Sequence, residues 1–190
     1  MKAGNKTLVD QIKIHLQAEH IRRLQIIENE DYSGVVRKTH EYLEETGVRF
    51  DQSYIDRGIH ALKQYYAIAL LDPANAHAVS IPVDPFWHAH ILHTEQYHVF
   101  CGGVVGEYMH HQPLDRGNNA QVENVKTLYS YTLEIMQKLF GSVDSDFWPE
   151  SGPDGLQICF HKGNQELYPD VQDIRLFEPD QRGRSYAFGV

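Results

Sequence analysis

Apolar side chains recur at every third or fourth position over most of the first 140 residues, which is the spacing of helices with one buried face. This pattern predicts helices over residues 7–28, 33–45, 52–71, 85–101 and 119–140. Near the end of the third helix the apolar residues become continuous, so we expect that end to be buried on every side.

Residues that start and stop helices support these limits. Gly47 and Gly141 follow two of the predicted helices, and Gly102-Gly103 is expected to end the helix that begins at residue 85. Asp84 and Pro85 are typical of a helix start, with the aspartate as the N-cap and the proline at the first helical position.

After residue 141 the chain becomes rich in proline and glycine. Short apolar runs at 156–160 and 174–177 are compatible with the two strands of a hairpin. We therefore predict a mainly α fold. It consists of a helical bundle-like domain over residues 1–141 and a loop-rich C-terminal extension over 142–190, which packs on that domain and has room for a short β-hairpin.

Composition and charge narrow the class of function. The 190 residues carry a net charge of -9 with histidine neutral, and an acidic chain repels nucleic acid. No apolar run approaches the roughly 18 residues that cross a bilayer, and the first residues show no signal-peptide pattern. We expect a cytoplasmic protein that binds neither nucleic acid nor membrane. Its two cysteines, Cys101 and Cys159, are too few for a disulfide framework.

Histidine is concentrated in one segment, from Asp84 to Pro113. Six of the 12 histidines lie between His88 and His111. Neutral imidazole is the commonest metal-binding side chain, and it suits iron, zinc and copper. The segment therefore predicts a site for a transition metal ion, with His88, His90, His93, His110 and His111 as the candidate ligands.

On a regular helix these histidines do not all face the same way. At about 100° per residue, His90 and His93 share a face, whereas His88 lies on the opposite side. Two arrangements remain open. In one, His90 and His93 are the helical ligands and one histidine of the pair His110-His111 completes the site. In the other, the first turn is distorted, or two sites exist, and His88 is also a ligand.

Two further side chains are candidates for supporting roles. Tyr97 shares the face of His90 and is a candidate catalytic residue that donates a proton or a hydrogen bond. Asp84 lies one turn before His88, where it either caps the helix or orients the imidazole ring. We favour the cap, because Pro85 fits a helix start so well.

The usual metal and nucleophile motifs are missing. The sequence contains no Cys-x-x-Cys, His-Glu-x-x-His, Cys-x-x-Cys-His or Gly-x-Ser-x-Gly pattern. This excludes zinc fingers, the common metalloproteases, attached haem and the usual serine hydrolases.

The segment resembles the glycine-rich-domain-containing-protein-like family over residues 33–113. The positions that carry this resemblance are Asp84, Trp87, His88, His90, Tyr97, Cys101, Gly106 and the ending His110-His111-Gln112-Pro113. The resemblance implies a site rather than a reaction. It marks seven site residues, which are Asp84, Trp87, His88, His90, Tyr97, Cys101 and His111. It strengthens the case for His88 and weakens that for His93, which the family pattern does not require.

The preferred function is a small metalloenzyme in which the histidine cluster holds Fe, Zn or Cu for oxidative chemistry on a small molecule or peptide. The alternative is a non-catalytic structural or partner-binding module. In that case the Trp-His-x-His helix belongs to the core or holds a structural metal.

Overall fold

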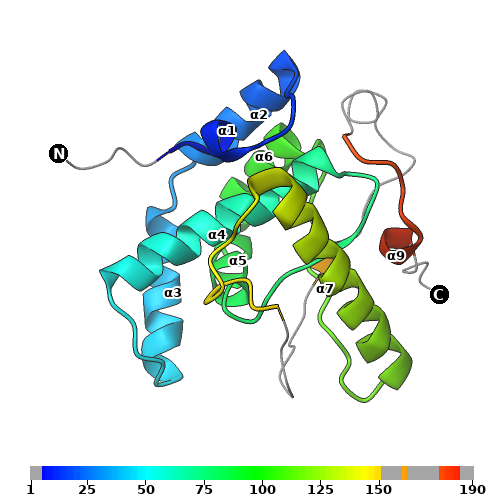
Figure 1. The fold of residues 1–190 in the computed structure, drawn as a ribbon. Helices are drawn as coiled ribbons and strands as arrows, with labels where there is room; N and C mark the ends of the chain where they lie inside the picture. Colours follow the sequence, from blue (N-terminus) through cyan, green and yellow to red (C-terminus); the bar gives the residue numbers. More distant parts are fainter. Residues whose placement is uncertain (1–5, 151–159, 162–175, 185–190) are drawn as a thin grey trace.

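The structure is a computed structural model that describes residues 6–150, 160–161 and 176–184, most of which lie in helices (Figure 1). This confirms the prediction of a mainly α fold. The elements in chain order are α1 (Leu8–Gln11), α2 (Ala18–Asn29), α3 (Ser33–Glu45), α4 (Gln52–Leu71), β1 (His77–Ala78), α5 (Asp84–Ile91), α6 (Thr94–Val104), α7 (Asn119–Phe140), β2 (Phe160–His161) and α9 (Gln181–Arg184).

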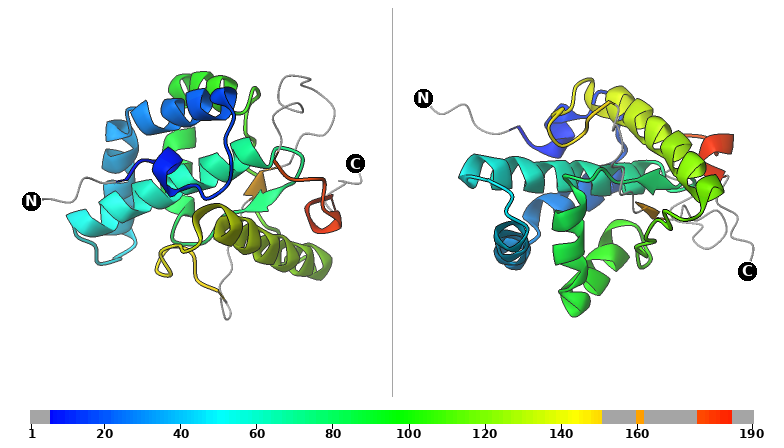
Figure 2. Two further views of the ribbon diagram at one scale, coloured as in Figure 1. Left: turned by 45° about the horizontal axis from the view of Figure 1, so that its top comes forward. Right: turned by 90° about the horizontal axis from the view of Figure 1, so that it is seen from below.

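Helix α4 is the centre of the molecule. In Figure 1, α1 and α2 lie above it and α3 and α5 below it, and Figure 2 shows α5 running steeply across its direction. α4 contacts α1, α2, α5 and α7. Residues 64–71 of α4 are all buried, as the continuous apolar run predicted. Because α4 is closely packed by its neighbours, it holds the elements that contact it in fixed positions.

The contact between α4 and α5 depends on one glycine. A side chain at Gly58 would collide with the ring of Phe86, which is fully buried on α5. The absence of a side chain at Gly58 therefore lets α5 approach α4 closely. This contact fixes the helix that carries Asp84 and His88 against the core.

The prediction of one helix over 85–101 was wrong, because the chain breaks after Ile91 and starts again at Thr94. At the break, His93 has φ -88° and ψ 62°, which is not helical. Its ring Nδ1 bonds to the carbonyl of Ala89 at 2.8 Å. In a continuous helix that carbonyl would accept from the His93 backbone N–H, so the side chain competes with the helix. α6 then continues past Gly102-Gly103 to Val104.

The two strands join distant parts of the chain. β1 pairs antiparallel with β2, with His77 opposite His161 and Ala78 opposite Phe160. Residues 156–159 and 174–175 of the expected hairpin lie outside the described residues. The described part of its first run therefore pairs with β1, and Leu176 donates its backbone N–H to Leu71 at 3.1 Å.

The segment that follows α7 returns to the core. Phe147 and Trp148 are buried there, beside side chains of α4. The division of the chain at residue 141 stays a prediction. Among the helices that the structure describes, none combines the length and the apolar character needed to cross a membrane.

Candidate metal centre

Potential ligand atoms of three side chains, two on a helix and one on a loop segment, lie close together. Asp84 and His88 lie on α5, and His111 lies in the segment between α6 and α7. One ligand atom from each residue lies within 4.8 Å of the others. This group can hold a metal ion.

The distances within this group suit a single ion. Oδ2 of Asp84 lies 3.6 Å from Nε2 of His88, and Oδ1 lies 3.4 Å from Nε2 of His111. The two Nε2 atoms face each other in direct contact. Around an ion with bonds of about 2.1 Å, neighbouring ligand atoms lie about 3.0–3.4 Å apart. The ligand atoms therefore need only small movements to surround an ion.

Helix geometry places Asp84 beside His88. The N-cap of α5 is Val83, which has helical backbone angles, and Asp84 is the first helical residue. Asp84 is therefore not the N-cap residue, and our preference for a cap was wrong. Residues four apart share a helix face, so the carboxylate projects toward the His88 imidazole. The Asp-x-x-x-His spacing was the sequence signal for this pairing.

The group is enclosed on one side and open on the other. The side chain of Asp84 is 11% exposed and that of His111 15%, whereas that of His88 is 48% exposed. Oδ1 of Asp84 is buried and has no hydrogen-bond partner among the described residues. A buried carboxylate oxygen without a donor is costly. A cation between the three side chains would remove that cost.

Burial also affects the imidazole of His88. It lowers the pKa of His88 and the neighbouring His111 lowers it further, while the Asp84 carboxylate raises it. A lowered pKa keeps the ring neutral near physiological pH, which is the form that binds metal.

Comparison with known families identifies the group to which this chain belongs. The family described as UCP032817-like matches residues 22–134, which is more than half of the chain. The chain belongs to the UCP032817-like family. The three residues of the candidate metal centre all lie within the matched range.

The family match corrects the earlier resemblance to glycine-rich-domain-containing proteins. That resemblance rested on a few positions between Asp84 and Pro113, whereas the UCP032817-like family matches residues 22–134. A few matching positions are not specific enough to distinguish families. No curated protein and no solved structure matches the chain.

In this UCP032817-like chain, His90 lies in the core rather than beside His88. It is fully buried, and its Nδ1 bonds with the hydroxyl of Tyr66 at 2.8 Å. Its Nε2 points toward Glu30, with 3.9 Å to Oε1. Burial lowers the pKa of His90 to about 4, so the ring is neutral. Two residues along a helix turn by about 200°, which explains why His88 faces out and His90 faces in.

The structure does not bring the other candidate ligands to the centre. His93 is held by the Ala89 carbonyl, and its ring packs on Gly34. His110 is exposed, and its ring lies against Tyr108 with 4.8 Å between centroids. Metal binding by these residues stays a prediction.

Tyr97 is fully buried in the core of this family member. Its hydroxyl accepts a hydrogen bond from Nε1 of Trp87 and donates one to the carbonyl of Met109, each at 2.8 Å. Burial raises the pKa of Tyr97 well above its usual value. The catalytic role predicted for Tyr97 stays a prediction.

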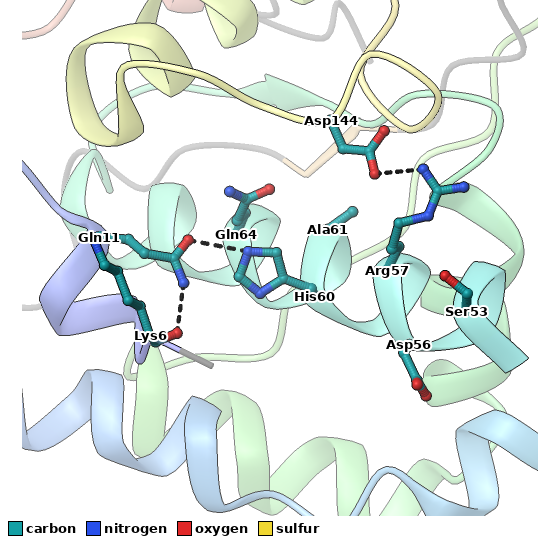
Figure 3. A pocket seen from close by; sticks show the side chains of 9 residues that line it. All are labelled: Lys6, Gln11, Ser53, Asp56, Arg57, His60, Ala61, Gln64 and Asp144. Carbon is teal, nitrogen blue, oxygen red and sulfur yellow. Dashed lines mark hydrogen bonds and ion pairs between the residues drawn. The ribbon is translucent and has the colours of Figure 1, made fainter. Parts of the chain in front are cut away.

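A separate cavity of about 290 Å³ lies between α1, α4 and the segment after α7 (Figure 3). It is lined by Lys6, Gln11, Ser53, Asp56, Arg57, His60, Ala61, Gln64 and Asp144. His60 bonds to Gln11 at 3.1 Å, and Arg57 pairs with Asp144 at 2.8 Å. The predicted metal ligands are not among its lining residues, so the cavity is distinct from the metal centre.

Proposed function

We propose that the chain is a metal-dependent enzyme in which Asp84, His88 and His111 bind one side of a transition metal ion and leave its other side open. The observation that carries this proposal is the meeting of two imidazoles and one carboxylate at a partly exposed position. Two histidines and one carboxylate form the facial triad of many iron(II) enzymes. Three protein ligands leave coordination positions open for water, oxygen or substrate.

The exposure of His88 favours a catalytic over a structural metal. Structural zinc sites are closed by four protein ligands and contribute to folding. Here three ligands come together and the side chain of His88 is 48% exposed. The mixed nitrogen and oxygen donors favour Fe(II), with Zn(II) second and Cu(II) third. Oxidative chemistry on a small molecule or peptide is the reaction class that suits this choice.

Metal titration of untagged protein tests the proposal. Protein stripped with a chelator is titrated with Fe(II) under nitrogen, and separately with Zn(II) and Cu(II). We expect one ion per chain, and His88→Ala and His111→Ala should each weaken binding at least about 100-fold. His98→Ala is the matched control, since His98 is an exposed histidine of α6 outside the three-residue group. Absence of binding, or equal binding by all variants, would show that the proposal is wrong.

The open positions can be tested separately. Nitric oxide added to the Fe(II)-loaded protein should give the electron paramagnetic resonance signal of an iron–nitrosyl complex, because it needs a free position on the metal. A metal-loaded protein without this signal, whose metal-free form is unfolded, would favour the structural alternative.

A further inference from the structure

We infer that Tyr97 is a positioning residue for the metal centre: its hydroxyl holds the segment that carries His111 against the helix that carries His88. This inference rests on the proposed function. The Tyr97 hydroxyl makes no hydrogen bond to any of the three ligand residues. The hydroxyl instead joins the two chain segments from which the ligands come.

The first half of the link leads to His111. Tyr97 donates its O–H to the carbonyl of Met109 at 2.8 Å, and Met109 precedes His111 by two residues. His111 lies between α6 and α7, outside both helices. A ligand on a loop needs contacts from elsewhere to hold its position, whereas a ligand on a packed helix does not.

The second half of the link leads to α5. Trp87 donates its Nε1–H to the same hydroxyl at 2.8 Å, and it is the neighbour of His88. Its ring also lies against the ring of His111, with 4.9 Å between centroids. One hydroxyl therefore joins the helix that carries Asp84 and His88 to the segment that carries His111.

The chemistry fixes the direction of both hydrogen bonds. An indole N–H only donates and a backbone carbonyl only accepts. The hydroxyl of Tyr97 must therefore accept from Trp87 and donate to Met109. Phenylalanine at this position would keep the ring but lose both bonds. Groups that hydrogen-bond directly to metal ligands typically change metal affinity about 10- to 100-fold when they are removed, and we expect a loss in this range when the link between the two ligand-bearing segments is cut.

The test compares Tyr97→Phe with a matched control, Tyr66→Phe. Tyr66 is also fully buried, but its hydroxyl bonds to the core residue His90. Affinity for Zn(II) is measured by competition with a chelator, and folding is followed by circular dichroism. We expect Tyr97→Phe to weaken binding about 10- to 100-fold, with little change in Tyr66→Phe. The inference would be overturned if Tyr97→Phe bound Zn(II) as tightly as the wild-type protein, or if both variants lost the same affinity.

A spectroscopic measurement separates positioning from general destabilisation. In Co(II)-loaded protein, each ligand imidazole gives an exchangeable N–H proton signal shifted by the metal. We expect two such signals in the wild-type protein, and loss or displacement of the His111 signal in Tyr97→Phe. Two unchanged signals in that variant would contradict a positioning role.

A measurement on the wild-type protein alone covers the case in which Tyr97→Phe does not fold. Coupling between two sites is reciprocal, so a link that favours metal binding is itself strengthened by the metal. Zn(II) should therefore slow hydrogen exchange of the Trp87 indole N–H about 10-fold. The only other tryptophan, Trp148, is the internal control. Unchanged exchange at Trp87 in metal-loaded protein would overturn the inference alone. Wild-type protein that takes up no metal would overturn it together with the proposed function.

Discussion

Two aspartate–histidine pairs in this molecule have the same chemical groups and opposite surroundings. Asp72 and His77 both follow the end of α4, with 3.0 Å between Oδ2 and Nε2, and both side chains are fully buried. Asp84 and His88 lie on α5 at 3.6 Å, and the histidine is half-exposed. Residue type alone does not distinguish the two pairs.

In the buried pair, both carboxylate oxygens of Asp72 accept hydrogen bonds from other buried side chains. Oδ1 of Asp72 accepts from Asn75 at 2.6 Å, and Oδ2 accepts from the hydroxyl of Tyr131 at 2.6 Å. Asn75 also accepts the backbone N–H of Asp180 at 2.8 Å. The network joins α4, α7 and the segment before α9. Oδ1 of Asp84, in contrast, has no hydrogen-bond partner among the described residues. A buried carboxylate whose two oxygens are both hydrogen-bonded stabilises a fold, whereas a partly exposed group of ligand atoms can bind an ion.

The largest effect is expected from breaking the buried pair. Asp72→Ala removes the acceptor of Asn75 and Tyr131 and the carboxylate that lies 3.0 Å from Nε2 of His77. We expect the free energy of unfolding to fall by about 3–5 kcal/mol, because the Asn75 amide and the Tyr131 hydroxyl each lose a buried hydrogen bond and His77 loses its carboxylate. Guanidinium unfolding measures this loss. Asp84→Ala is the control, and an equally large loss in that variant would erase the proposed difference between the pairs.

A pH titration of stability extends the comparison to His90, a buried histidine whose Nε2 lies 3.9 Å from Oε1 of Glu30. Burial lowers the pKa of His90 to about 4 in the folded protein, against about 6.5 in the unfolded chain. Between these values the unfolded state binds more protons than the folded state. The contribution of His90 to the free energy of unfolding is therefore fully present above pH 6.5 and is lost as the pH falls toward 4. The slope from this residue is at most about 1.4 kcal/mol per pH unit.

His90→Gln should reduce that slope in metal-free protein, as measured by urea unfolding at a series of pH values. His98→Gln, on the exposed side of α6, should leave the slope as it is in the wild-type protein. Identical slopes in the wild-type protein and His90→Gln would mean that His90 does not titrate in this way.

A smaller loss should follow when one acceptor of the buried network is removed. Thr132 accepts the backbone N–H of Ala78 at 3.0 Å and donates to the Leu128 carbonyl. Thr132→Val keeps the shape but leaves the Ala78 N–H unpaired, at a cost of about 1–2 kcal/mol. Thermal unfolding detects this change. Thr127→Val, an exposed position whose hydroxyl bonds within its own helix, should change stability by less than about 0.5 kcal/mol.

The smallest effect on folding is expected at the metal centre. Asp84→Asn should change the stability of metal-free protein by less than about 1 kcal/mol, because Asp84 is not the N-cap and Oδ1 has no hydrogen-bond partner among the described residues. The same variant should lose the rise in melting temperature that Zn(II) gives the wild-type protein. A metal-free Asp84→Asn protein as unstable as Asp72→Ala would show that the two pairs do not differ.

Local patterns predicted three of the long helices well, whereas the prediction of one helix over 7–28 was wrong, because the structure has α1 and α2 there with a non-helical segment between them. The limits of α3, α4 and α7 follow from apolar spacing and from Gly47, Asp72 and Gly141 at their ends. The break at His93 was missed because it depends on a side chain bonding to the Ala89 carbonyl and packing on Gly34. Periodicity does not contain that information.

The candidate centre was predicted as a segment, and its membership needed the fold. Sequence spacing indicated that His88 and His90 face opposite ways, and this is what the structure shows. The spacing did not show which of the two faces the core. That depends on packing against α4. The Tyr66 hydroxyl of α4 hydrogen-bonds to His90, and Gly58 of α4 leaves room for the ring of Phe86.

The sequence by itself determined the mainly α fold, the concentration of histidines and the four-residue spacing of Asp84 and His88. These properties are local, because they depend on helical periodicity and residue type. Only the tertiary structure decided that His111 joins them, because its position depends on contacts made by residues far from it along the chain. The same packing places the Asp84 carboxylate beside His88 and His111, where it is a candidate ligand rather than the expected cap. It also buries His90 in the core.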